Sequence, residues 1–245
     1  MTPETANIRY ELLPGDFSRL YRRYYRLHGI NVDINPEWNI DNWLDRVHPN
    51  FNSTIFEAVF YYQARTEKEE RFELCIATKE MKAAAWKYVH KKQLILDGTF
   101  GLCTARLLVW IAMGVDENNH GVPVAIFLFS APTGAKATHA GYDTKILTKL
   151  LSRWKESFDK ENGVVFGPCV AITDTDTKER GALIKTWPTI KLLLCKYHLR
   201  QCWTNKREAL LGKGAVDFFK SHVENRLRSL EQACVVYCFQ FYFGP

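Results

Sequence analysis

The sequence predicts an α+β fold in which helices flank a mixed β-sheet, and two features of its hydrophobic pattern carry that prediction. Three strand-like runs between residues 93 and 131 follow one another with short turns, so they can pair as antiparallel hairpins. After them, helical and strand-like segments alternate as far as residue 211. With 245 residues, 47% of them hydrophobic, the chain can bury the core of one sizeable domain.

Residues 1–90 are expected to form a mostly helical or irregular N-terminal region. The stretch DFSRLYRRYYRLHG predicts a helix with Leu20, Tyr24 and Leu27 on one face and four arginines on another. A basic, tyrosine-rich helix of this kind can touch nucleic acid, but docking of its apolar face on the domain is the favoured interpretation. Residues 56–78 predict a strand, a charged turn and a second strand, and residues 81–92 predict a helix.

The expected core covers residues 91–205. Its segments are strands at 93–103, 105–116 and 121–131, a long helix at 141–163, a strand at 167–173, a helix at 178–188, a strand at 190–195 and a helix at 196–211. Three antiparallel strands followed by alternating helices and strands is the order of the ribonuclease-H-like fold. We therefore expect a five-stranded mixed sheet flanked by helices, with helical segments N-terminal and C-terminal to it; residues 206–245 are expected to be the start of a truncated helical insertion region.

Composition limits the environment of the chain. No apolar run reaches the roughly 20 residues that span a bilayer, and the N-terminal residues lack a signal-peptide core. Seven cysteines are scattered without a dense framework, which indicates a reduced, intracellular compartment. The net charge of +6 permits an anionic partner without requiring one.

Two aspartates stand at the positions where chemistry is expected. Asp97 interrupts the apolar run LILDGTFG, and an unpartnered charge there would cost several kcal/mol if it were buried. Asp174 directly follows the strand CVAIT. If these two strands are neighbours, the carboxylates converge at one edge of the sheet, where Mg²⁺ or Mn²⁺ prefers oxygen ligands. Gly98 would then leave room for the metal or for a nucleic-acid backbone.

Each aspartate also has a structural interpretation. Asp97 can be a satisfied aspartate in a β-bulge. Asp174 can cap the following helix, although Thr175, Asp176 or Thr177 would serve equally well. Asp176 is in addition a rival metal ligand, and Asp174 is preferred because it is the first residue past the strand.

The segment LLLCKYHLRQC contains half of a zinc-ligand spacing. Cys195 and His198 have that spacing, and Cys202 follows one helical turn later. A buried cysteine at a strand end and a histidine on the next helix are the favoured interpretation. Cys234 and Cys238 are the residues that would complete a four-ligand site.

Positive charge gathers after the last predicted strand. Between residues 196 and 228 there are eight lysines or arginines and three acids. A solvated helix surface and a phosphate-contacting face are equally good interpretations of this run. In the second case Arg200, Lys206 and Arg207 are the candidate nucleic-acid-binding residues.

Three segments in this order, LILDGTFG, AITDTDTKERGALIKTWP and LLLCKYH, resemble the catalytic core of Mutator-like element (MULE) transposases. This is a DDE group with a ribonuclease-H-like fold, and the resemblance covers about residues 70–205. It implies that Asp97 and Asp174, 77 positions apart, are catalytic, and that Cys195 and His198 form the family's Cys-x₂-His motif.

The resemblance also implies an activity and its partners. They are cleavage and transfer of DNA strands with Mg²⁺ or Mn²⁺, transposon ends and target DNA as substrates, and a nuclear location; it also allows a homo-oligomer. Two metal ions would activate a water or a 3′-hydroxyl and stabilise the leaving oxygen.

The chain departs from the family's pattern in two places. The family has a catalytic Glu after a helical insertion, whereas this chain ends 71 residues past Asp174, so we expect the third acid to be missing. Glu208 is the first substitute to consider, ahead of Glu224 and Glu231. The second departure is that no Cys/His array of a zinc-binding DNA module precedes residue 90.

Two other functions stay open at this point. One is a non-catalytic, transposon-derived remnant that binds DNA or protein. The other is an ordinary ribonuclease-H-like nuclease that uses Asp97, Asp174 and Asp176.

Overall fold

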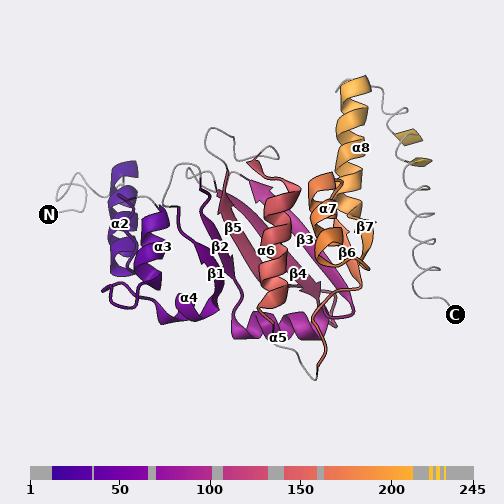
Figure 1. The fold of residues 1–245 in the computed structure, drawn as a ribbon. Coiled ribbons are helices and arrows are strands. Elements are labelled where there is room, and N and C mark those ends of the chain that lie inside the picture. The colour runs from indigo at the N-terminus through magenta and orange to yellow at the C-terminus, as the bar shows by residue number, and fades with distance from the viewer. Residues whose placement is uncertain are drawn as a thin grey trace.

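The computed structural model describes residues 13–34, 36–65, 70–100, 107–131, 141–158 and 163–211, with short helical pieces at 221–222, 225–226 and 229. A seven-stranded mixed sheet flanked by helices runs through the described part of the chain (Figure 1). The expected α+β class is confirmed. The expected number of five strands is wrong, because two strands from the N-terminal region extend the same sheet.

The seven strands take the spatial order β1-β2-β5-β4-β3-β6-β7. Their bounds are β1 Val59–Gln63, β2 Glu73–Ile76, β3 Gln93–Phe100, β4 Leu107–Val115, β5 Gly121–Ser130, β6 Val170–Thr173 and β7 Lys191–Leu194. The pairs β1–β2, β2–β5, β5–β4 and β4–β3 are antiparallel, whereas β3–β6 and β6–β7 are parallel. The predicted neighbourhood of the strand with Asp97 and the strand before Asp174 is therefore confirmed.

A tight turn joins β4 to β5, as the segment DENNHG predicts. The Asp116 carboxylate accepts hydrogen bonds from the backbone N–H groups of Asn118 (2.9 Å) and His120 (2.8 Å). Asn119 adopts a φ of 63°, which asparagine tolerates better than most residues. These hydrogen bonds and the backbone conformation of Asn119 thus stabilise the hairpin that the sequence predicts.

The helices are α2 Pro14–Leu27, α3 Pro36–Leu44, α4 Ser53–Ala58, α5 Lys79–Tyr88, α6 Thr144–Glu156, α7 Thr177–Thr186 and α8 Lys196–Leu211. α6 begins at an N-cap, Asp143, whose side chain accepts from the N–H of Ile146 at 2.9 Å. The apolar stripe predicted for α6 is buried from Ile146 to Trp154. The helix ends at Glu156, several residues before the predicted stop at Gly163.

Helices cover one face of the sheet and also lie beyond both of its edge strands. α6 lies on one face with α7 beside it, α2 and α3 lie beyond the β1 end, and α8 lies beyond the β7 end (Figure 1). The core between α6 and the sheet includes Leu94, Leu96 and Trp110 from the strands and Trp154 from the helix. Burial of such side chains stabilises the fold by about 1.5–3 kcal/mol each.

α2 has no buried residue. The favoured prediction, that its apolar face docks on the domain, is therefore wrong for the chain as the structure describes it. Of the helices within the described ranges, none combines the length and the apolar character that crossing a membrane requires.

Candidate active site

Asp97 and Asp174 come from neighbouring parallel strands. In the β3–β6 ladder Leu94 pairs with Ala171 and Ile95 with Ile172. Continuing that register by two residues brings Asp97 alongside Asp174, and both then share the sheet face of Ile95 because side chains alternate along a strand. Neighbouring strands are about 4.8 Å apart, so the continued register puts positions 97 and 174 on adjacent chains at one edge of the sheet.

The environment of Asp97 explains why a charge is tolerated in this strand. Leu94 and Leu96 point into the core and are 0% and 3% exposed, whereas the Asp97 side chain points to the other face and is 52% exposed. Water therefore solvates the carboxylate, and the penalty for burying an unpartnered charge does not arise. On α8, the imidazole of His198 faces this carboxylate, with Nε2 3.9 Å from Asp97 Oδ1.

The structure explains the glycine at position 98 differently from the sequence-based prediction. A Cβ at this position would lie 2.6 Å from Cε2 of Trp110, which is its partner across the β3–β4 ladder. The missing side chain makes room for the indole on the core face, and not for a metal or a nucleic-acid backbone beside Asp97. The interpretation of Gly98 as space for a ligand is therefore wrong.

In the loop after β6, Asp174 and Asp176 have different roles. Asp176 is the N-cap of α7, because its Oδ1 accepts from the N–H of Lys178 at 2.6 Å and of Glu179 at 3.4 Å. Asp174 Oδ1 accepts from the N–H of Asp176 at 2.6 Å, which fixes the orientation of that carboxylate. Asp176 thus fills the capping role that was an alternative for Asp174.

Tyr142 holds the second oxygen of the cap. Its hydroxyl donates to Asp176 Oδ2 at 2.6 Å. Burial raises the pKa of Asp176, but the hydrogen bonds from Tyr142 and from the α7 amides outweigh it, so the net pKa is lowered. For the tyrosine, burial and the bond to the carboxylate both raise the pKa. Asp176 therefore stays ionised and occupied, which makes it a weaker metal ligand than Asp174.

Glu179 is the residue of this site that sequence reasoning missed. It lies on α7, is 2% exposed, and both of its oxygens are hydrogen-bonded. Trp110 Nε1 donates to Oε2 at 3.1 Å, and the hydroxyl of Thr173 donates to Oε1. Trp110 lies against Gly98, next to Asp97, and Thr173 precedes Asp174. One buried carboxyl thus connects the neighbours of both candidate catalytic acids.

The pKa of Glu179 depends on its burial and on the three aspartates around it. Burial raises its pKa to about 8, the bond from Trp110 opposes that rise, and the charges of Asp174, Asp176 and Asp97 add to it. The carboxyl group is consequently neutral at pH 7. The same influence shows that the three aspartates concentrate negative charge at this corner of the sheet, which is the charge that a divalent cation would compensate.

Cys195 and His198 lie at the junction of β7 and α8. The N–H of Cys195 donates to the carbonyl of Thr173 at 2.7 Å and so continues the β6–β7 ladder. Nδ1 of His198 is buried, with no hydrogen-bond partner in the described part of the chain, while Nε2 faces Asp97. Cys202 is exposed, and Cys234 and Cys238 lie outside the described residues.

The predicted nucleic-acid-binding residues all lie on α8. Arg200 and Lys206 are exposed and Arg207 is partly buried. Glu208, the candidate third acid, is exposed on the same helix, whereas Glu224 and Glu231 fall outside the described residues.

The candidate donors at this corner are carboxylate oxygens, a ligand type that a hard cation accepts. Among the described residues, no three His, Cys, Asp or Glu side chains gather into a metal-holding group. Mg²⁺ is commonly bound by one or two carboxylates, with water and substrate phosphates completing its shell. Asp97 and Asp174 offer that number of carboxylates at a solvent-accessible corner.

The comparisons with known proteins add no relative. No protein-family model matches the chain, and no curated protein matches it.

Proposed function

We propose that this chain is the catalytic core of a DDE-type DNA transposase similar to the Mutator-like elements, with Asp97 and Asp174 as two of its acids. The observation that carries the proposal is the adjacency of their strands: β3 and β6 are parallel neighbours, and their register, continued by two residues, would align the two carboxylates on one face. Paired carboxylates at a strand edge are suited to metal-dependent phosphodiester chemistry.

The sheet supports the finer assignment to a ribonuclease-H-like fold. The strands β3, β4 and β5 form an antiparallel meander, and β6 and β7 follow as parallel strands on the other side of β3. This is the succession of strands that we expect for that fold from the order of the predicted elements. The strands β1 and β2 are then an addition at the β5 edge.

Each described residue of the site has a role in this proposal. Asp97 and Asp174 would hold Mg²⁺ or Mn²⁺, and the backbone N–H of Asp176 orients the Asp174 carboxylate. A bound cation would activate a water or a 3′-hydroxyl and stabilise the leaving oxygen. His198 faces Asp97, with its Nε2 3.9 Å from Asp97 Oδ1.

The partner would be DNA, that is, transposon ends and target DNA, and the proposed location is the nucleus. α8 supports this because it starts beside the site and carries Arg200, Lys206 and Arg207. Guanidinium groups pair well with phosphate oxygens. A duplex that crosses the carboxylates would therefore meet positive charge along this helix.

The test combines metal binding with strand cleavage by the whole chain. Asp97→Asn and Asp174→Asn should each weaken Mn²⁺ binding at least tenfold in a calorimetric titration and abolish Mn²⁺-dependent nicking of a DNA duplex. Glu156→Gln, an exposed carboxylate at the end of α6, is the control and should change neither quantity. Unchanged Mn²⁺ affinity in both aspartate variants would contradict the proposal.

A second candidate is a non-catalytic, transposon-derived protein that binds DNA or protein. One observation favours it. Of the other acids that the structure describes near Asp97 and Asp174, Asp176 caps α7 and Glu179 is buried with both oxygens bonded. For this candidate we expect wild type to bind Mn²⁺ without nicking the duplex. The variant Glu208→Gln should likewise show no nicking.

A further inference from the structure

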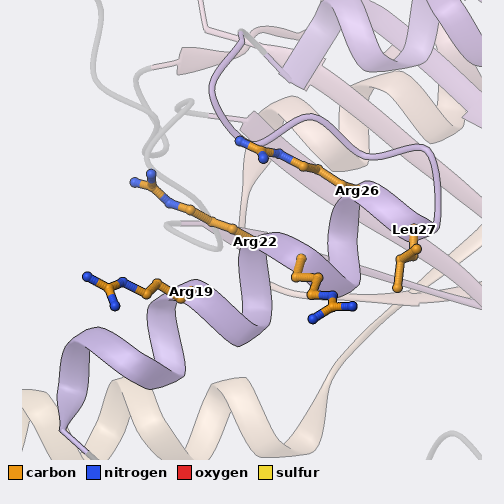
Figure 2. Close-up of a pocket in the computed structure, with 5 residues that line it drawn as sticks. Arg19, Arg22, Arg26 and Leu27 are labelled. Atoms are coloured by element: carbon orange, nitrogen blue, oxygen red, sulfur yellow. The ribbon is translucent and has the colours of Figure 1, made fainter.

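α2 carries a positively charged face that the proposed active site does not use. Arg19, Arg22, Arg23 and Arg26 lie within eight residues, and together with Leu27 they line a shallow hollow on the surface. Figure 2 shows Arg19, Arg22 and Arg26 directed away from the side of the helix on which Leu27 lies. All four arginines are exposed.

The opposite side of α2 is apolar and equally exposed. Its large side chains are Leu13, Phe17, Leu20, Tyr24 and Leu27, and each is at least 48% exposed. At about 100° per residue, these five fall within an arc of about 80°, and the four arginines fall within an arc of about 100°. The centres of the two arcs are about 130° apart, so one flat ligand cannot cover both.

The arginines are only lightly neutralised by their own chain. Arg22 and Arg26 share the single carboxylate of Asp33, at 3.6 Å and 3.2 Å, and all three side chains are largely exposed. Exposed ion pairs contribute little, about 0–1 kcal/mol, so an outside anion can replace Asp33. For Arg19 and Arg23 the structure describes no carboxylate partner within its ranges.

The geometry of the two arcs selects among possible ligands for the arginines. A membrane surface would take up the apolar arc, and Arg22 would then point about 180° away from the headgroups. A partner helix on the apolar arc would reach only Arg23, at the border of that arc. Arg19, Arg22 and Arg26 extend over about 10 Å of helix axis, the rise of about three nucleotides of one DNA strand.

We propose that the arginine face of α2, made of Arg19, Arg22, Arg23 and Arg26, binds the phosphate backbone of nucleic acid. Guanidinium groups bind phosphate oxygens in a bidentate manner. This surface is separate from α8: the two helices lie beyond opposite ends of a seven-stranded sheet, whose outermost strands β1 and β7 are about 29 Å apart by the spacing of strands (Figure 1). The inference rests on the proposed function only for the choice of DNA as the probe.

The test measures binding of a fluorescent 30-base-pair duplex by the whole chain in EDTA, between 50 and 200 mM salt. Arg19→Gln/Arg23→Gln removes two charges and leaves the pairs with Asp33 intact. If both arginines contact phosphates, the slope of log affinity against log salt falls by about 2. The affinity gap between wild type and variant then widens about tenfold from 200 to 50 mM salt.

The matched control is Lys91→Gln/Lys185→Gln, which removes two exposed charges at the end of the sheet remote from the carboxylates. A smaller salt slope in the α2 variant than in the control supports the inference, provided both retain the circular dichroism of wild type. Equal slopes in the two double variants, or no duplex binding by wild type at 50 mM salt, would overturn it. Binding of phosphatidylserine vesicles that the α2 variant loses, with duplex binding unchanged, would also overturn it.

The outcome is separable from that of the proposed function. The assay contains no divalent cation, so it measures duplex binding without strand cleavage. Loss of binding in the α2 variant together with absence of Mn²⁺-dependent nicking by wild type would uphold this inference and reject the transposase. Mn²⁺-dependent nicking by wild type, together with equal salt slopes in the α2 variant and the control, would support the transposase and reject this inference.

Discussion

Replacement of Glu179 by Gln gives the sharpest test of how the site is built. Gln has the same shape as the neutral carboxylic acid: its carbonyl can accept from Trp110 Nε1, and its amide can donate to Thr173 Oγ1 once that hydroxyl, which donates to Glu179 Oε1, rotates. It cannot ionise. The variant therefore keeps the contacts of Glu179 and removes only the cost of a buried negative charge beside three aspartates.

The magnitude follows from the shift in pKa. Burial raises the pKa of Glu179 from 4.5 to about 8 in the folded protein. Below pH 4.5 the group is protonated in both states, so its contribution to stability is fully present. Between pH 4.5 and 8 only the unfolded chain ionises, and the free energy of unfolding falls by about 1.4 kcal/mol per pH unit. The total loss approaches roughly 5 kcal/mol and is complete above pH 8.

The assay is urea unfolding of wild type and Glu179→Gln at half-unit steps from pH 4.5 to 9. The two proteins should be about equally stable at pH 4.5, and the variant should be several kcal/mol more stable at pH 9. Other titrating groups cancel in the difference, and Glu156→Gln, on the exposed end of α6, should show no such trend. A difference that does not change with pH would refute the assignment of Glu179 as a buried neutral acid.

Three further predictions concern stability, each measured as a free energy of urea unfolding at pH 7. Gly98→Ala should cost about 1–3 kcal/mol, because its Cβ would overlap the Trp110 indole; an effect below 0.5 kcal/mol would contradict that packing. Asp176→Ala should cost about 1 kcal/mol through loss of the α7 N-cap, and an unchanged midpoint would show that another group caps the helix. Lys149→Met leaves the buried Glu73 carboxylate without its partner at 2.8 Å; we expect a loss of about 2 kcal/mol, since Lys149 is partly exposed, and a stabilised variant would reverse the argument.

The strands and helices of the core could be predicted because each has a local signature. The stripe from Ile146 to Trp154 repeats at the helical period, and the strands β3 to β5 are continuous apolar runs joined by short turns. The signal for Asp97 was also present. Leu94 and Leu96 alternate with Ile95 and Asp97, and that alternation places the aspartate on the face opposite the core.

The attachment of β1 and β2 could not be predicted, because it depends on contacts between distant parts of the chain. β2 pairs with β5 through Glu73↔Phe129 and its neighbours, more than fifty residues apart in sequence. Local pattern identifies each strand but does not name its partner.

Glu179 was missed for the same reason. Three residues after the N-cap Asp176, a glutamate in KERG is typical of an exposed first turn, where it supports the cap. Its burial results from Trp110, which lies 69 positions earlier in the chain and crosses from β4 to reach it. The Gly98–Trp110–Glu179 contact is a property of the assembled sheet and has no counterpart in any single segment.

The attachment of β2 to β5 also decides how this chain can be divided. β5 is an inner strand because β2 covers its free side from Ile126 to Phe129. Removal of the residues before 91 would turn β5, one of the longest and most apolar strands, into an open edge with unpaired N–H and C=O groups. Such an edge is a template for pairing with other molecules, so the N-terminal segment protects the core from self-association as well as enlarging its sheet.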